Sequence, residues 1–125
     1  PKFLAAMLQG KRPTVFGDGK QSRDFTYVEN IVAGNLAAAE APAEKVAGRV
    51  FNVACGKQFS LLDLIASINR VLGTKLEPVF EPPRAGDVRE SLADISTARE
   101  ALGYEPTVDF DEGLARSIEY YRTIV

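Results

Sequence analysis

Glycines and prolines divide this sequence into segments that are too short for a large sheet. Gly10, Gly73 and Gly103 each follow an apolar pattern with helical spacing, at the position where a glycine C-cap is expected. The strand-like stretches between the helices are also short, and one of them contains Pro78, which favours an edge strand. A doubly wound sheet needs longer strands. The sequence therefore predicts a small α+β fold with helices and short strands, forming one domain over 1–125.

The apolar spacing predicts the order of the elements. The second helix should bury one stripe of side chains, formed by Ile31, Val32, Asn35, Leu36 and Ala39. Ser60 followed by Asp63 predicts a capped helix start, and Asp109 or Asp111 should cap the last helix. We expect helices at about 1–10, 28–41, 60–73, 94–102 and from 109 onward, and strands at 13–16, 22–28, 49–54 (buried) and 76–80.

Charge and composition exclude several classes of protein. With 15 basic and 17 acidic residues the net charge is −2, so the chain lacks the basic field that nucleic-acid-binding proteins carry. No apolar stretch reaches the roughly 18 residues that would suggest a membrane span. The absence of histidine excludes histidine-based triads and histidine-ligated metal sites, and we expect no metal site. The single cysteine, Cys55, fits a reducing compartment, so we expect a cytoplasmic protein.

The stretch 82–94 concentrates charge, glycine and proline without an apolar run. Arg84 and Arg89 each present a planar fork that matches a phosphate or carboxylate, and Asp87 can accept hydrogen bonds from two sugar hydroxyls. Gly86 allows the backbone to turn or to approach a ligand closely. This pattern predicts a loop that binds a sugar nucleotide by its diphosphate. The alternative is a solvated loop whose charges pair with each other, and for Arg89 both interpretations stay open.

Three motifs follow one another in a recognisable order. The segment 16–28 contains Phe-Gly-Asp-Gly and Arg-Asp-Phe-Thr-Tyr-Val, 51–56 contains Phe-Asn-Val, and 83–96 contains Pro-Arg-Ala-Gly-Asp and Ala-Asp-Ile-Ser. Together they resemble the C-terminal half of the extended short-chain dehydrogenases/reductases, the NAD-dependent sugar-nucleotide epimerases and dehydratases, and most closely the UDP-hexose 4-epimerases. The resemblance covers essentially the whole chain. It implies a C-terminal domain that holds a UDP-sugar against an N-terminal, NAD-binding Rossmann domain.

The resemblance also assigns individual residues to the UDP-sugar. It implies that Arg23 and Arg84 grip the diphosphate and that Asp87 binds the ribose hydroxyls. A small side chain at Ser91, in the hexose pocket, resembles tolerance of 2-N-acetyl sugars, because it leaves room for the acetamido group. The other residues of the implied site border the nucleotide (Phe25), run past the uracil (Thr14, Val15 and Phe16) or lie near the phosphates (Asn52).

Two motifs of the family are absent from this sequence. Gly17 and Gly19 are not followed by the third glycine of a dinucleotide-binding loop. No tyrosine has a lysine four residues later, so the catalytic Tyr-x-x-x-Lys is missing. We therefore expect no catalytic residue and no NAD binding by this chain alone, with NAD held by the absent Rossmann half of the parent enzyme. The start at Pro1, without methionine, fits a fragment of a longer protein.

Other interpretations remain open. The parent enzyme could be a dehydratase or decarboxylase with the same anchoring half. The chain could instead be a non-catalytic nucleotide-sugar-binding module, or a structural domain in which Arg23 and Arg84 are ion-paired. In the family that this sequence resembles, helices of the C-terminal half pack on the Rossmann domain. We therefore expect this chain to have an exposed apolar face and to self-associate through it.

Overall fold

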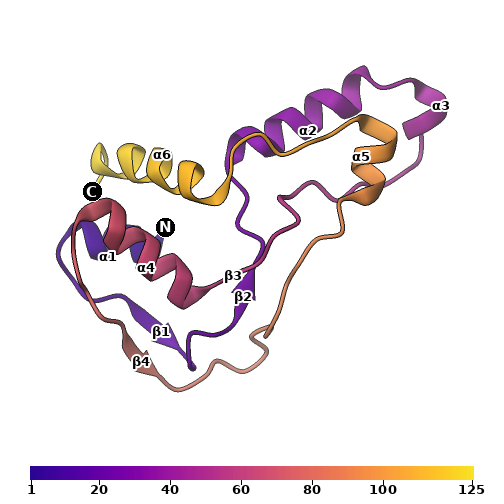
Figure 1. Ribbon diagram of the computed structural model, residues 1–125. Helices are drawn as coiled ribbons and strands as arrows, with labels where there is room; N and C mark the ends of the chain where they lie inside the picture. The colour runs from indigo at the N-terminus through magenta and orange to yellow at the C-terminus, as the bar shows by residue number, and fades with distance from the viewer.

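Two groups of helices and two short strand pairs make up the computed structural model, which describes residues 1–125 (Figure 1). Helices α1, α4 and α6 lie together at one end, and α2, α3 and α5 lie at the other. The mixture of helices and short strands agrees with the predicted α+β class. In chain order the elements are α1 (Lys2–Leu8), β1 (Thr14–Phe16), β2 (Ser22–Arg23), α2 (Val28–Glu40), α3 (Ala43–Val46), β3 (Phe59–Ser60), α4 (Leu61–Leu72), β4 (Val79–Glu81), α5 (Ser96–Leu102) and α6 (Phe110–Arg122).

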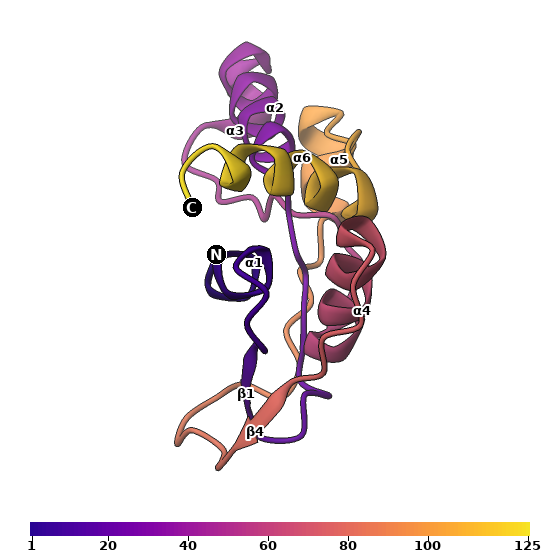
Figure 2. The same ribbon diagram turned by 90° about the vertical axis from the view of Figure 1, so that its left-hand side faces the viewer.

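The larger apolar core lies among α1, α4, α6 and β1 (Figure 2). Met7, Ile68 and Ile118 are its most completely buried long side chains, and burial of each contributes about 1.5–3 kcal/mol. The ring of Phe59, directly before α4, stacks on that of Phe110 at the start of α6, with centroids 4.0 Å apart. This stacking joins the beginnings of two helices that are distant in the sequence.

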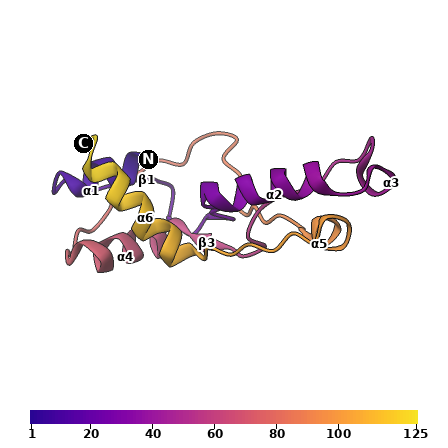
Figure 3. The same ribbon diagram turned by 90° about the horizontal axis from the view of Figure 1, so that it is seen from above.

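A second, smaller core lies between α5 and the segment 51–54. It is formed by Ala54, Ile95, Ala98 and Tyr104. The Tyr104 hydroxyl donates a hydrogen bond of 2.8 Å to the carbonyl oxygen of Ala54, which satisfies both polar groups inside the cluster. Burial raises the pKa of the Tyr104 phenol. The two cores explain the elongated arrangement of the helices seen from above (Figure 3).

Helix α2 approaches the second core closely because Gly34 has no side chain. A Cβ atom at Gly34 would lie only 2.4 Å from a methyl carbon of Val53. The helix axis can therefore come nearer to the segment 51–54 than any larger residue would allow.

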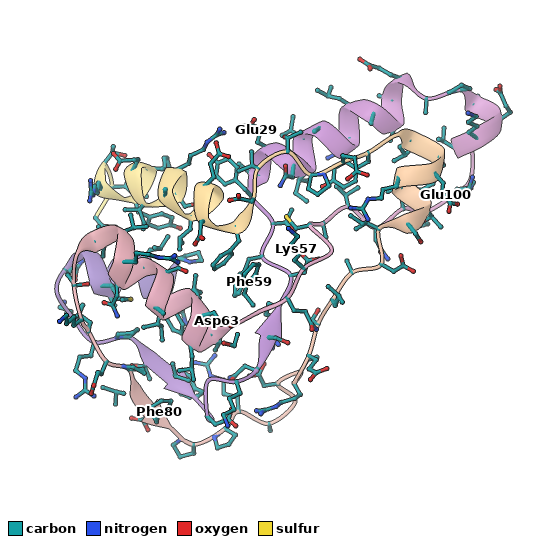
Figure 4. All side chains as sticks on the ribbon, in the orientation of Figure 1. Glu29, Lys57, Phe59, Asp63, Phe80 and Glu100 are labelled. Atoms are coloured by element: carbon teal, nitrogen blue, oxygen red, sulfur yellow. The ribbon has the colours of Figure 1, made fainter.

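Each strand pair is a separate sheet of two strands. Strand β1 runs parallel to β4, with Val15 opposite Phe80, and β2 runs antiparallel to β3, with Arg23 opposite Phe59. Every strand is therefore an edge, and for β4 this is the position that Pro78 predicted. Figure 4 shows Phe80 on β4, where its side chain is 55% exposed.

The predicted helix ends are largely confirmed. Ser60 and Asp63 form a reciprocal capping box at the start of α4, where Figure 4 labels Asp63. The hydrogen bonds from Ser60 lower the pKa of the Asp63 carboxyl. Asp109 caps α6 by accepting a hydrogen bond from a backbone N–H of its first turn. Gly73 and Gly103 end α4 and α5 in the left-handed conformation. No helix of the structure combines the length and apolar character that a membrane crossing requires.

The predicted inner stripe of α2 is wrong. Val32 and Leu36 are 50% and 57% exposed, whereas Asn30 and Gly34 are the buried residues of this helix. Hydrogen bonds of the Asn30 side chain and the close approach at Gly34 determine which face points inward. The prediction rested on hydrophobic spacing, which selected the face opposite to the one that is buried in the structure.

Two predicted strands differ from the structure. The segment 49–54 forms no strand: it has no neighbouring strand to pair with, and Val50 is 91% exposed. The predicted strand 22–28 is paired only at Ser22 and Arg23, because the chain then turns directly into α2. The sequence also predicts Asp94 or Ser96 as the cap of α5. In the structure the N-cap residue is Ile95, and the Asp94 carboxylate accepts a hydrogen bond from the backbone N–H of Ser96.

Candidate functional site

A cavity of about 620 Å³ lies between the start of α1, strand β1 and the loop that follows β4. Basic side chains dominate its polar lining, with Lys2, Arg12 and Arg84 against a single acid, Asp87. Phe16 supplies an aromatic ring to the wall. An anionic molecule with a flat or hydroxylated part would find complementary groups on these walls.

Arg84 lies over the ring of Phe16, with the guanidinium carbon 3.7 Å from the ring centroid. This cation–π contact holds the guanidinium group beside the aromatic wall of the cavity. Arg84 takes part in none of the ion pairs of the structure. Its five donors can therefore be used by an anion in the cavity.

Arg23 is bound within the protein instead. It makes an ion pair of 2.7 Å with Asp87 and donates a second hydrogen bond to the carbonyl oxygen of Ser22. The other Asp87 oxygen accepts a longer hydrogen bond, 3.3 Å, from the side-chain amide of Gln21. The same amide nitrogen donates to the carbonyl oxygen of Phe16 at 2.7 Å. Gln21 thus connects β1 to the stretch 82–94, the charged loop.

Backbone and ionic contacts hold the charged loop against β2. The N–H of Ser22 donates to the carbonyl of Arg89, and the N–H of Ser91 donates back to the carbonyl of Ser22. Arg89 also binds both carboxylate oxygens of Asp18, at 2.7 and 3.1 Å. These hydrogen bonds from Arg89, together with one from the backbone of Lys20, lower the pKa of Asp18 to about 2. The structure therefore shows Arg89 in the salt-bridged arrangement.

Of the predicted site residues, the cavity brings together Phe16, Arg84 and Asp87, with Thr14 beside them. The side chain of Val15 is fully buried in the larger core. The remaining residues lie elsewhere: Phe25 lines a neighbouring, mainly apolar cavity near Phe110, Asn52 donates to the carbonyl oxygen of Asp94, and Ser91 is exposed on the charged loop. Their roles toward a ligand stay predictions.

Two polar residues of structural importance were not predicted. Gln21 is 6% exposed and lies two positions before Arg23, so the alternation of the extended segment could have placed it on the same side. Asp24 accepts hydrogen bonds from the backbone N–H groups of Cys55 and Gly56, at 3.0 and 2.8 Å. No sequence pattern indicates this contact, because its donors are backbone groups more than thirty positions away.

Comparisons with known proteins support a relationship over the whole chain. A model of the NAD dependent epimerase/dehydratase family matches residues 1–54. The UDP-glucose 4-epimerase of Mycolicibacterium smegmatis is 39% identical over 120 residues, which are 96% of this chain and 37% of that protein. The UDP-glucuronic acid decarboxylase 1 of Arabidopsis thaliana is 34% identical over 96% of this chain and 27% of its own length.

Comparison with solved structures also supports this relationship. A UDP-glucose 4-epimerase from Thermotoga maritima with UDP-glucose superposes with a TM-score of 0.89 at 40% identity, covering 97% of this chain and 38% of that one. A UDP-glucuronic acid 4-epimerase from Bacillus cereus, in complex with UDP-glucuronic acid and NAD, gives a TM-score of 0.93 at 34% identity, covering 99% and 39%. The chain spans less than half the length of these relatives. Residues 1–54 match the NAD dependent epimerase/dehydratase family, and nearly the whole chain is similar to part of the epimerases and the decarboxylase named above.

Proposed function

We propose that this chain is the C-terminal, nucleotide-sugar-binding part of an NAD-dependent sugar-nucleotide 4-epimerase. The observation that carries this proposal is the cavity in which Arg84, free of ion pairs, lies on Phe16 beside Asp87. A UDP-sugar offers a diphosphate for the guanidinium group, a base for the aromatic wall and a ribose diol for the carboxylate. The related structures that contain UDP-glucose or UDP-glucuronic acid support this choice of ligand class.

The residues of this chain act by positioning. Arg84, and Arg23 once it exchanges Asp87 for a phosphate, hold the diphosphate, while Asp87 and the backbone beside Phe16 fix the nucleoside. Holding one end of the substrate reduces the orientational freedom that the reaction must remove, while the hexose stays free to turn. NAD, which a related structure contains, supplies hydride chemistry at the sugar. We assign NAD to none of these residues, and the chain alone is proposed to be inactive.

The hexose pocket is proposed to accept a 2-acetamido sugar. Ser91 presents a small side chain on the charged loop, whose position is fixed by the hydrogen bond from its backbone N–H to Ser22. A UDP-N-acetylglucosamine 4-epimerase from Methanobrevibacter ruminantium superposes on this chain with a TM-score of 0.90 at 36% identity. That similarity supports UDP-N-acetylhexosamine as a substrate of the whole enzyme.

Two alternatives are each favoured by a specific observation. The similarity to a UDP-glucuronic acid decarboxylase fits a parent enzyme that shares the anchoring half and differs in chemistry. The Arg23–Asp87 ion pair fits a purely structural or oligomerisation domain, but Arg84, which that alternative also expects to be ion-paired, lies over Phe16 without an ion pair. A non-catalytic nucleotide-sugar-binding module would use the same cavity as the proposed epimerase part.

The exposed face of α2 is proposed to be an interface with the Rossmann half of the whole enzyme. Val28, Val32 and Leu36 follow one another at helical spacing and are 50–63% exposed. In this chain alone the same face should cause self-association. Sedimentation at high concentration should show dimers or larger species, and Leu36→Lys should shift them toward monomer. A monodisperse wild-type monomer would contradict this part of the proposal.

Calorimetric titration tests the nucleotide-sugar site. Wild-type chain should bind UDP and UDP-N-acetylglucosamine, and Arg84→Ala should bind each roughly ten- to a hundredfold more weakly, as expected for loss of charge-assisted hydrogen bonds. Arg49→Ala is the matched control, because Arg49 also lies over a phenylalanine ring, Phe51, but does not line the cavity. Equal affinities of the wild type and Arg84→Ala would contradict the proposed clamp.

A further inference from the structure

The turn that contains Gly17 and Asp18 is attached to both ends of the segment 82–88. Before the segment, the N–H of Gly17 donates a hydrogen bond of 2.9 Å to the carbonyl oxygen of Glu81. After it, the Asp18 carboxylate accepts hydrogen bonds from the guanidinium group of Arg89 at 2.7 and 3.1 Å. Two adjacent residues of one turn therefore limit how far the two ends of this segment can separate.

Between these attachments the segment 82–88 is held by few contacts of its own. All of its residues are exposed. Its one internal backbone hydrogen bond, from the N–H of Asp87 to the carbonyl oxygen of Arg84, is long at 3.3 Å. Its main side-chain contacts are the ion pair of Asp87 with Arg23 and the contact of Arg84 with the ring of Phe16. The freedom of Arg84 therefore depends on how firmly the ends of the segment are held.

The turn is itself attached to α4. The N–H of Leu62, in the first turn of that helix, donates a hydrogen bond of 3.1 Å to the carbonyl oxygen of Gly19. The Asp18 carboxylate also accepts a hydrogen bond of 2.9 Å from the backbone N–H of Lys20, which orients the carboxylate within the turn. Exposed ion pairs generally contribute little, but a bidentate arginine–carboxylate pair is an exception, so the contact with Arg89 can hold the loop.

Neither Asp18 nor Arg89 lines the cavity, so an effect of this pair on a ligand there must pass through the loop. Resting on the function proposed above, we infer that Asp18 is a positioning residue, which through Arg89 holds the segment 82–88 so that Arg84 stays over Phe16 before an anion binds. The ligand then binds without having to order the segment, and such preorganisation increases affinity.

Calorimetric titration of Asp18→Asn with UDP tests this role. Removal of a negative charge should by itself leave the affinity for an anion unchanged or increase it slightly. Loss of preorganisation should instead weaken UDP binding roughly three- to tenfold. Asp111→Asn is the matched control, because it removes the same charge from another exposed ion pair, that of Asp111 with Arg70, outside the cavity lining. The control should bind UDP as the wild type does.

Two further variants separate positioning from a general loss of structure. The double exchange of Asp18→Arg with Arg89→Asp should recover most of the affinity, because it restores an ion pair between the turn and the loop. In the Arg84→Ala background, Asp18→Asn should cause no further loss, because the pair acts through Arg84.

The outcomes distinguish this inference from the proposed function. If Asp18→Asn binds UDP as tightly as the wild type, or loses equal affinity with and without Arg84, the positioning role is overturned while Arg84-dependent UDP binding stands. If the wild type binds no UDP, the proposed function fails and this inference fails with it.

Discussion

Replacement of Asn30 by alanine should destabilise the fold more than any other exchange of a single polar side chain on α2. Asn30 is completely buried. Its amide oxygen accepts hydrogen bonds from the backbone N–H groups of Thr107 and Val108, at 3.0 and 3.1 Å, and its amide nitrogen donates to the carbonyl oxygen of Val108 at 2.7 Å. These contacts attach α2 to the segment that leads into α6.

The magnitude follows from the partners that Asn30→Ala would leave behind. Three hydrogen bonds at a net value of about 1 kcal/mol each give roughly 3 kcal/mol. Val108 is 3% exposed, so water cannot readily replace the lost partner of its N–H and carbonyl groups. The higher helix propensity of alanine offsets about 0.5 kcal/mol. The expected decrease in the free energy of unfolding is therefore about 2–3 kcal/mol.

Urea denaturation followed by far-ultraviolet circular dichroism measures this loss. Asn35→Ala is the matched control, because Asn35 is on the same helix, is exposed and bonds only to the carbonyl oxygen of Ile31. The control should change stability by no more than about 0.5 kcal/mol. Amide hydrogen exchange in α2 should also accelerate in Asn30→Ala, because the helix loses its attachment to the segment that leads into α6. A loss below 1 kcal/mol, or an equal loss in the control, would refute the reasoning.

Three further predictions concern backbone packing, capping and acid stability. Gly34→Ala should lower the free energy of unfolding, measured by urea titration, by about 1–3 kcal/mol despite the gain in helix propensity. In the double variant, Val53→Ala should restore much of this loss, because it removes the side chain that the new methyl group meets. Additive losses in the double variant would contradict the close contact between Gly34 and Val53. Ser60→Ala should lower the melting temperature of the chain through loss of about 1 kcal/mol, and rescue by threonine but not by valine would confirm the cap. The pKa of Asp18 in the folded chain is about 2, below its ordinary value of 3.8. Its pairing with Arg89 therefore stabilises the fold above pH 4, and this stabilisation is lost as the pH falls toward 2. The melting temperature of Asp18→Asn should decline less steeply with falling pH than that of the wild type, and identical pH profiles would exclude this contribution.

Helix positions could be predicted from this sequence because their signals are local. Ser60 and Asp63 lie within one helical turn and complete a capping box with each other, and Gly73 ends the same helix without help from distant residues. The burial of α2 could not be predicted in the same way. Its inner face is selected by Asn30 and Gly34, whose partners come from 107–108 and from Val53. Such partners are visible only in three dimensions.

The candidate site could be predicted only where its residues lie close together in the sequence. Arg84 and Asp87 are three positions apart, so their chemistry can be read from one short loop. That Asp87 binds Arg23 and Gln21 depends on how this loop is placed beside β2, and no periodic pattern in the sequence reports it. The same placement explains why Arg89, equally suited to phosphate by its residue type, binds Asp18 instead.

The placement of the charged loop couples the site to the larger core. Ser22 exchanges backbone hydrogen bonds with the loop on one side and pairs with Ser60 of β3 on the other. Ser60 is also the cap of α4, whose Ile65 and Ile68 are buried in that core. Hence the cavity wall that carries Asp87 is connected through β2 and β3 to one of the most firmly packed helices, whereas α2, α3 and α5 pack around the second core and line none of the cavity. The arm formed by these three helices can therefore meet another domain without disturbing the groups proposed to bind the diphosphate.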